Sequence, residues 1–248
     1  MIKQIIKSIL PETIKDKLVI IRNNFFCNHY MKSYSQEGED MILRRLFEKQ
    51  KRGFFIDIGA HHPKRFSNTY FFYRKGWNGI NIDAMPGSMR LFNRKRARDI
   101  NIEKPISDKG QLLTYYAFSE PALNGFSKEV SERREKQENI KLLFKKEMES
   151  VTLERVLDDN LINGQRIDFM SIDVEGLDLN VLKSTNFKKH QPSIILIEIL
   201  KSSMGEIENS EISKYLSKYD YFIFAKTINT VFFSKKKFFN KRFKNNQN

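Results

Sequence analysis

Cysteine is nearly absent from this 248-residue sequence: Cys27 is the single example, so no disulfide can form within the chain. The one cysteine and the four histidines show no metal-ligand spacing, which argues against a structural zinc site. A chain without an internal disulfide fits a reducing compartment, and we expect a cytoplasmic protein.

Long hydrophobic runs are missing as well. The longest uninterrupted apolar stretches are a few residues, too short for a transmembrane helix. A secretory signal is not expected either, because Lys3, Lys7, Glu12 and Lys15 interrupt its apolar region and no small-residue cleavage site follows.

Glycine is scarce where a dinucleotide site would need it. Gly59 lies in the turn Asp57-Ile58-Gly59-Ala60, and no further glycine occurs before Gly76, so the pattern G-x-G-x-x-G is absent. That pattern lets backbone N–H groups close on a pyrophosphate at a helix N-terminus. Its absence disfavours NAD and FAD as cofactors.

The residues around this turn nevertheless follow the order of a nucleoside-binding βαβ unit. An apolar segment at 53–56 predicts a buried strand before the turn, and a second at 79–82 ends on Asp83, 24 residues beyond Gly59. The Asp83 carboxylate can accept hydrogen bonds from both ribose hydroxyls. S-Adenosylmethionine has an adenosine but no phosphate, and Asp57 is placed to influence its cationic end. The spacing favours a methyltransferase over another nucleotide-binding protein or a cofactor-free α/β domain.

Five motifs in a fixed order strengthen this interpretation. They are 34–40 (YSQEGED), 55–63 (FIDIGAHHP), 67–69 (SNT), 76–86 (GWNGINIDAMP) and 168–176 (DFMSIDVEG). Over residues 34 to 200 the sequence resembles the FkbM family of S-adenosylmethionine-dependent methyltransferases. The resemblance implies a Rossmann-like class I methyltransferase: an α/β fold with a mostly parallel seven-stranded sheet, an antiparallel last strand and helices on both faces. It also implies O-methylation of a sugar or glycan acceptor, often in surface-polysaccharide synthesis.

The resemblance and the βαβ layout together give a set of expected cofactor-binding residues. These are Asp57, Gly59, Ala60, Asn68, Asp83, Ala84, Ser107 and Asp173. The family usually has alanine before the Ile-Ser pair at 106–107, whereas this chain has Pro105. Proline removes a backbone donor there and fits an edge strand.

Candidate catalytic residues follow from the topology expected of the sheet. The carboxyl ends of parallel strands meet in one crevice, so Asp173 and Glu175 should lie at the same rim as Asp57 and Asp83. Either carboxylate could be the general base for a hydroxyl acceptor or hold the substrate, although one of them could instead cap the following helix.

Two further possibilities concern the same crevice. His61 or His62 could supply the base, because histidine titrates in the working range, and we include His62 among the catalytic candidates. A divalent metal bound by Asp173, Glu175 and Glu198 is conceivable, but carboxylates alone do not establish one, and we predict no metal.

The formal net charge of +14 is concentrated at the chain ends, with +4 in residues 1–32 and +6 in residues 235–248. This distribution disfavours a nucleic-acid substrate, which would need a basic stripe beside the active site. Residues 1–33 predict an amphipathic helical segment that either packs on the domain or rests on anionic lipid. The tail 235–248 is expected to be disordered, with contact to lipid or to nucleic acid as two possibilities. A peripheral position on the inner face of the membrane is thus an alternative to a soluble location.

We expect the methyltransferase domain to span residues 34–234, with a variable insertion at 119–149. A densely charged helix is predicted from 129 to 149, either a lid over the acceptor or a solvated surface helix. The basic run at 94–98 is interpreted as a solvated helix face. An RNA or protein methyltransferase, or a non-catalytic membrane-attached scaffold of the same fold, are the alternative functions.

Overall fold

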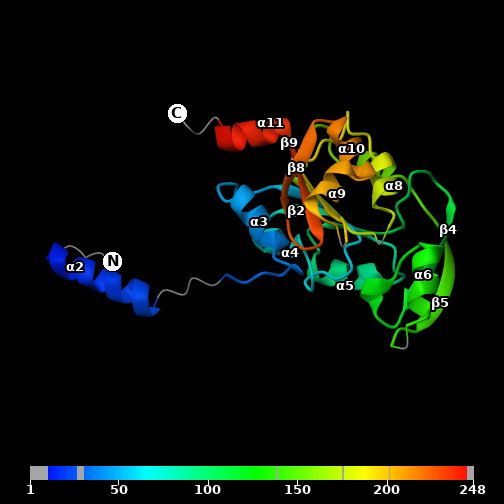
Figure 1. Cartoon of the computed structure of the whole chain (residues 1–248), viewed down its shortest axis with the longest axis horizontal. Helices are drawn as coiled ribbons and strands as arrows, with labels where there is room; N and C mark the ends of the chain where they lie inside the picture. The colour runs from blue at the N-terminus through cyan, green and yellow to red at the C-terminus, as the bar shows by residue number, and fades with distance from the viewer. Residues whose placement is uncertain (1–10, 27–30, 138, 175, 201, 245–248) are drawn as a thin grey trace. The chain divides into compact units, whose positions relative to one another are not determined.

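In the computed structural model, residues 11–26, 31–137, 139–174, 176–200 and 202–244 are described. The residues before Ser33 form one compact unit and the chain from Ser33 onward forms another. In the first unit, α2 (Glu12–Ile21) begins after Pro11 and runs into a π-helical turn, η1 (Arg22–Phe26) (Figure 1). No residue of α2 is buried. None of the described helices is both long and apolar enough to cross a membrane.

The second unit is built on a sheet for which the described residues supply seven strands. The strands are β1 (Phe54–Ile58), β2 (Asn78–Asp83), β3 (Ile100–Glu103), β6 (Phe169–Ile172), β7 (Ile194–Glu198), β8 (Tyr221–Lys226) and β9 (Thr230–Lys235). Their order is β3-β2-β1-β6-β7-β9-β8. The last strand of the chain, β9, is antiparallel to both neighbours, whereas the pairs from β3 to β7 are parallel. The predicted class I methyltransferase sheet is therefore confirmed.

Helices cover both faces of this sheet because successive strand residues point to opposite sides. On β1, Phe55 packs against α3 (Glu39–Leu46) and α4 (Tyr70–Arg74). Its neighbour Ile56 joins the core under α7 (Leu153–Asn160), α8 (Asp178–Lys183) and α10 (Glu211–Ser217). Two further helices of this unit are α5 (Ser88–Lys95) and α9 (Met204–Asn209).

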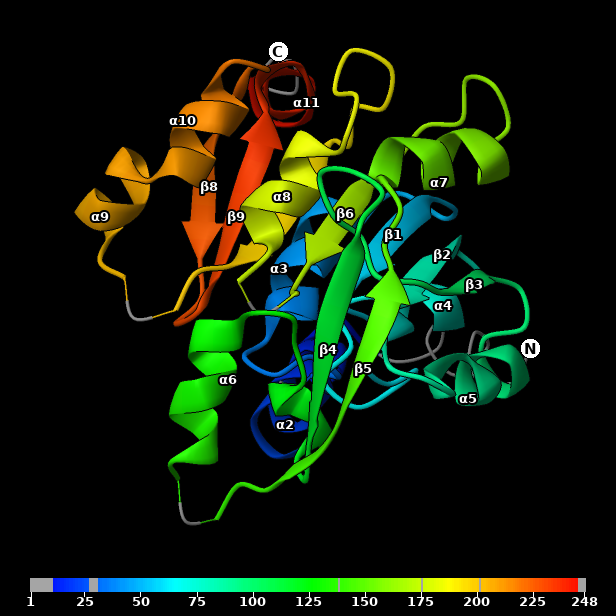
Figure 2. The same cartoon turned by 90° about the vertical axis from the view of Figure 1, so that its right-hand side faces the viewer.

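The insertion at 119–149 differs from the single long helix that we predicted. Among the described residues of this range, the α-helix is α6 (Lys128–Glu135), and it follows a 3-10 turn, η2 (Pro121–Leu123). The following residues form β5 (Leu142–Glu149), which pairs antiparallel with β4 (Leu112–Phe118) in a separate two-stranded sheet. Figure 2 shows β4 and β5 side by side, with α6 next to them. Backbone pairing with β4 thus overrides the helical preference of the Lys- and Glu-rich segment.

The basic tail also differs from the expected disorder. It forms α11 (Lys236–Phe239) and a π-helical turn, η3 (Asn240–Lys244). The Phe238 ring lies 5.5 Å from the Phe47 ring, and Phe239 lies 5.3 Å from Phe222. Arg242 donates a hydrogen bond to the Leu46 carbonyl at 3.0 Å. These contacts hold residues 236–244 on the domain.

Two carboxylates, one just before α3 and one at its first residue, join this part of the chain to the β8–β9 turn and the start of β9. Glu37 accepts hydrogen bonds from the Asn229 backbone N–H at 2.8 Å and from its side-chain amide at 2.6 Å. Glu39 accepts one from the Thr230 hydroxyl at 3.0 Å. These bonds fix the rim of the sheet at the carboxyl ends of its strands.

Candidate active site

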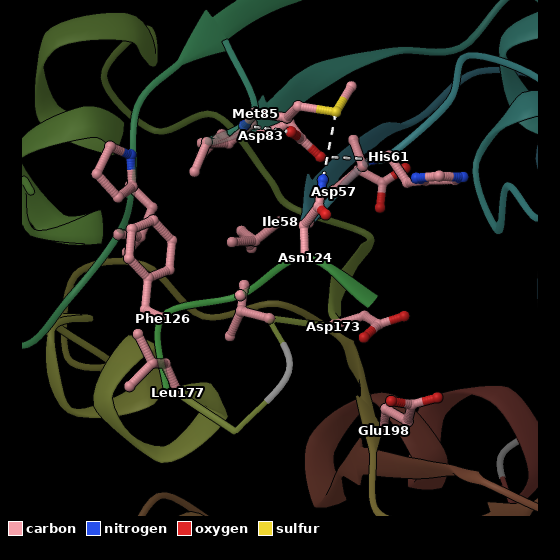
Figure 3. A pocket seen from close by; sticks show the side chains of 18 of the residues that line it. Asp57, Ile58, His61, Asp83, Met85, Asn124, Phe126, Asp173, Leu177 and Glu198 are labelled. Carbon is pink, nitrogen blue, oxygen red and sulfur yellow. Dashed lines mark hydrogen bonds between the residues drawn. The ribbon is translucent and has the colours of Figure 1, made fainter. Parts of the chain in front are cut away.

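A cavity of about 330 Å³ opens at the carboxyl ends of β1, β2, β6 and β7. It falls within the usual size range of small-molecule sites. Predicted residues that line it are Asp57, Gly59, Ala60, His61, Asn68, Asp83, Ala84, Asp173 and Glu198. Figure 3 shows Asp83 at one end of this pocket and Asp173 with Glu198 at another. The structure therefore brings most of the expected site together.

The glycine turn owes its shape to Gly59. This residue has a φ of +78°, and a Cβ on it would lie 1.7 Å from the Asp173 carbonyl oxygen. Both facts require glycine at this position. The backbone N–H groups of Gly59 and Ala60 both donate to the Ile82 carbonyl, at 2.9 and 3.0 Å. Because these donors are already used, the turn does not offer them to a phosphate group.

Asp57 is buried at the end of β1 and accepts a hydrogen bond from the Thr69 hydroxyl at 2.8 Å. Burial raises the pKa of Asp57 to about 6, although the Thr69 hydrogen bond and the charge of Arg96 oppose the rise. A cationic partner beside Asp57 would favour its ionised form and so oppose the effect of burial.

Arg96 supports this arrangement, and our expectation for it was wrong. We interpreted the basic run at 94–98 as a solvated face, yet Arg96 is fully buried. It donates hydrogen bonds to Asp99 at 2.8 Å and to the Thr69 hydroxyl at 3.1 Å. Because Thr69 in turn donates to Asp57, Arg96 positions the Asp57 carboxylate through one intervening side chain.

Asp83 ends β2, and its two carboxylate oxygens hold the neighbouring loops. One accepts a hydrogen bond from the His61 N–H at 2.8 Å, and the other accepts one from the Met85 N–H at 2.7 Å. Burial raises the pKa of Asp83, while both N–H donors favour its ionised form. Each carboxylate oxygen has a second lone pair, so the group can still accept from a ligand hydroxyl.

The two histidines have different positions. His61 lines the pocket, and burial lowers its pKa in spite of the nearby Asp83. His62 is not among the lining residues, and its Nδ1 accepts hydrogen bonds from the backbone N–H groups of Lys64 and Arg65, at 3.0 and 2.8 Å. The structure therefore gives His62 a role in the loop and does not bring it to the pocket.

Two expected cofactor residues differ in their relation to the cavity. Asn68 lines it and donates a hydrogen bond to the Ser171 hydroxyl at 3.0 Å. Ser107 is buried outside the lining, where its N–H donates to the Val151 carbonyl. The residues directly before it, including Pro105 and Ile106, form the wall instead.

β4 and the insertion supply another wall of the cavity. The sequence predicted an insertion here that could cover the acceptor, but not which of its residues would line the pocket. Tyr115 on β4 packs against Phe126, with ring centroids 5.2 Å apart. Asn124 accepts a hydrogen bond from the Phe118 N–H at 2.7 Å and contacts the Met85 sulfur. Arg134 on α6 reaches the same cavity. No motif in this segment could have identified these residues, because contacts between segments place them, such as the paired backbone hydrogen bonds between Tyr116 on β4 and Gly125.

Asp173 follows β6 directly, is exposed and lines the pocket. Its N–H donates to the Ile58 carbonyl at 2.9 Å, which fixes the backbone beside Gly59. Glu198, at the end of β7, lines the same cavity. Glu175 lies outside the described residues, so its catalytic role stays a prediction. Among the described residues, no group of three or more His, Cys, Asp or Glu is arranged to hold a metal, and the metal-free reaction also stays a prediction.

Several solved structures that are similar to this chain are methyltransferases by their descriptions. A TehB-like S-adenosylmethionine-dependent methyltransferase from Corynebacterium glutamicum matches with 9% identity and a TM-score of 0.38, over 91% of this chain and 97% of that one. A methyltransferase from Geobacter sulfurreducens matches with 12% identity and a TM-score of 0.39, over 94% and 96%. Precorrin-6y C5,15-methyltransferase from Geobacter metallireducens matches with 10% identity and a TM-score of 0.40, over 85% and 92%.

A comparison with curated proteins returned no match. The model of the methyltransferase FkbM domain matches residues 57–223, which run from Asp57 through the sheet into β8. The match includes the glycine turn, Asp83, the insertion and Asp173. The chain therefore belongs to the FkbM family of methyltransferases, enzymes that use S-adenosylmethionine as their cofactor.

Proposed function

We propose that this enzyme methylates a hydroxyl group of a sugar, in the synthesis of a surface glycan. The observation that carries the proposal is the exposed carboxylate of Asp173, at the end of the pocket where Glu198 also lies (Figure 3). A hydroxyl is a weak nucleophile at neutral pH, and a carboxylate in contact with it can accept its proton as the new bond forms.

The other end of the pocket fits the cofactor. The turn at Gly59 offers no N–H pair for a phosphate, which suits a ligand with an adenosine and a sulfonium. Asp83 would hold the ribose, and Asp57 the cationic amino-acid end. When bound, S-adenosylmethionine supplies an electrophilic methyl group. The residues of this chain contribute by orientation, which accounts for much of the rate of such a displacement.

A sugar acceptor suits the character of the lining. Gln36, Asn68, Asp173 and Glu198 offer acceptor oxygens for several hydroxyl groups at once. The exposed ring of Phe66 and the half-buried ring of Phe126 give an apolar surface beside them. A neutral polyol therefore meets both polar and apolar partners.

The charges of the pocket disfavour a nucleic-acid substrate. Four carboxylate residues line it, Asp57, Asp83, Asp173 and Glu198, against the cations Lys104 and Arg134. Phosphate groups would be repelled by this excess of negative charge.

The experiment is a transfer assay with radiolabelled S-adenosylmethionine and a panel of free sugars, nucleotide sugars and short oligosaccharides. RNA and a mixed protein sample serve as competing acceptors. We expect label on a sugar, and we expect Asp173→Asn to lower turnover about a hundredfold while cofactor affinity, measured by calorimetry, changes little.

A matched control is Asp159→Asn, which removes the same charge from the exposed surface of α7. It should keep the wild-type rate. Label that appears on RNA or protein and on no sugar would refute the acceptor class. Near-full turnover of Asp173→Asn would show that the base lies elsewhere.

A further inference from the structure

A basic groove lies at the amino ends of β1 and β2, opposite the active site. Two adjoining cavities, of about 840 and 550 Å³, share Arg52, Gly53 and Asn78 and together form this groove. Cations dominate its lining, and Asp168 is the one carboxylate among the described lining residues. The sequence has most of its excess positive charge near the chain ends. In the folded domain, positive charge is also concentrated in this groove.

Among the described residues, two of the eight cations in this groove form an ion pair. Arg166 pairs with Asp168, and Arg242 pairs with Glu48 at 2.9 Å. Within the part of the chain that the structure describes, no ion pair is formed by the other six, which are Lys49, Lys51, Arg52, Lys75, Arg98 and Lys241. Unpaired cations in one groove attract an anionic partner.

The groove and the active site lie at opposite ends of the same strands. β1 has Phe54 in the groove and Ile58 in the pocket, and β2 has Asn78 in the groove and Asp83 in the pocket. A strand of five or six residues separates the two ends by about 17–20 Å. A partner bound in the groove therefore leaves the active site open.

The C-terminal helix extends the same basic surface. Lys241 and Arg242 line the groove, and the exposed residues Lys236, Lys237 and Lys244 belong to the same segment. Because aromatic contacts hold this segment on the domain, its lysines are carried on a fixed support.

The N-terminal unit carries an apolar feature of its own. Ile14, Leu18, Ile21 and Phe25 recur at helical spacing and so follow one side of the helix, and all four are exposed. Lys15 and Lys17 lie in the same helix, where their stems can run along apolar surface while the charged ends reach a polar interface. A polyanion such as RNA would leave this apolar stripe uncovered.

We propose that the basic groove, the C-terminal helix and the stripe on α2 together attach this enzyme to the surface of an anionic membrane. Basic residues draw the protein to anionic headgroups, and the apolar stripe of α2 enters the interface between headgroups and acyl chains. Two such signals are what stable peripheral attachment requires. With the groove against the lipid, the active site opens toward the aqueous phase, and the acceptor enters from there.

The test is sedimentation of the full-length protein with vesicles of phosphatidylcholine that do or do not contain phosphatidylserine. We expect the protein to pellet with the anionic vesicles at low salt and to be released at high salt. The triple variant Lys51→Glu, Arg52→Glu, Lys241→Glu should lower partitioning at least tenfold, and Leu18→Asp should lower it independently. All four side chains are exposed or line the groove, and circular dichroism checks the fold of each variant.

The control carries the same charge change at exposed lysines outside the groove: Lys141→Glu, Lys183→Glu, Lys188→Glu. It should bind vesicles like the wild type, and an equal loss in this variant would overturn the assignment of the groove. Absence of pelleting with anionic vesicles would overturn the membrane proposal, as would binding of a single-stranded RNA oligonucleotide in place of vesicles. The affinity for S-adenosylmethionine should be the same with and without vesicles, because the active site opens away from the lipid. Loss of this affinity on vesicles would overturn the proposed orientation of the enzyme on the membrane.

Discussion

The backbone of Gly59 packs directly on the carbonyl oxygen of Asp173, so closely that a Cβ on Gly59 would lie 1.7 Å from that oxygen. The contact joins the turn after β1 to the first residue after β6. Since Asp57 and Asp173 both line one pocket, the absence of a side chain on Gly59 sets how near these two residues come to each other.

Gly59→Ala tests this contact against a matched control. Gly164 has nearly the same φ, +79°, and open space where a Cβ would stand. Gly164→Ala therefore reports the cost of backbone strain alone, about 1 kcal/mol. Gly59→Ala should lower the free energy of unfolding by several kcal/mol, because the carbonyl must also move. Urea unfolding compares the two, and equal losses would contradict the contact.

Asp83→Asn should weaken cofactor binding. The substitution removes the negative charge and one acceptor, and hydrogen bonds to charged groups contribute roughly 1.5–3 kcal/mol each, so affinity should fall about tenfold or more. Isothermal titration of S-adenosylmethionine measures it. Glu103→Gln is the control, because Glu103 is the register neighbour of Asp83 on β3 and is exposed outside the pocket. An unchanged affinity in a folded Asp83→Asn protein would remove Asp83 from the cofactor site.

The burial of Asp57 predicts a pH dependence of stability. Its pKa is raised from 3.8 to about 6 in the folded state, so the folded protein keeps a proton that the unfolded chain loses as the pH rises above 3.8. The stabilisation that this proton provides is complete below pH 3.8 and is lost as the pH rises through about 6. The total is about 3 kcal/mol for a shift of this size.

The measurement is urea unfolding of the wild type and of Asp57→Asn between pH 4 and pH 7. Asparagine keeps an oxygen to accept from Thr69 but does not titrate. The wild type should lose stability relative to the variant across this range. A difference between the two proteins that is independent of pH would show that Asp57 ionises normally.

The C-terminal helix should contribute to the stability of the domain. Phe238 is half-buried against Phe47, and its replacement by alanine should cost about 1–3 kcal/mol of unfolding free energy. Lys237→Ala, one residue earlier and exposed, should change stability by less than about 0.5 kcal/mol. If Phe238→Ala unfolds at the wild-type urea concentration, the helix is not held by this contact.

The sequence predicted the parts of the site that local patterns encode. The strand that leads to Asp57 and the strand that ends on Asp83 are apolar runs, and Gly59 marks the turn after the first. The order of strand, turn and strand could therefore be predicted from the sequence itself. The mostly parallel seven-stranded sheet with its antiparallel last strand was predicted from the family resemblance, because no local pattern states that β9 pairs with β7.

The errors arose where distant contacts decide the structure. Residues 142–149 have a composition typical of a helix, and pairing with β4 turns them into a strand. Arg96 belongs to a run of cations, and only the buried acceptors Asp99 and Thr69 explain why this one is inside. His62 was placed beside the turn correctly, but its bonds to the Lys64 and Arg65 N–H groups could not be read from the sequence.

The position of β9 also affects how the chain can be made. β9 lies between β7 and β8 in the sheet, although the ribosome produces it after both. Until it emerges, the four fully buried residues Ile194, Ile195, Leu196 and Ile197 belong to an edge strand that lacks a partner on that side. Unpaired apolar edges in nascent chains are prone to pair with other chains. Nonsense or frameshift mutations that remove β9 should therefore yield aggregates during translation, even though every residue we have placed in the pocket would already have been synthesised.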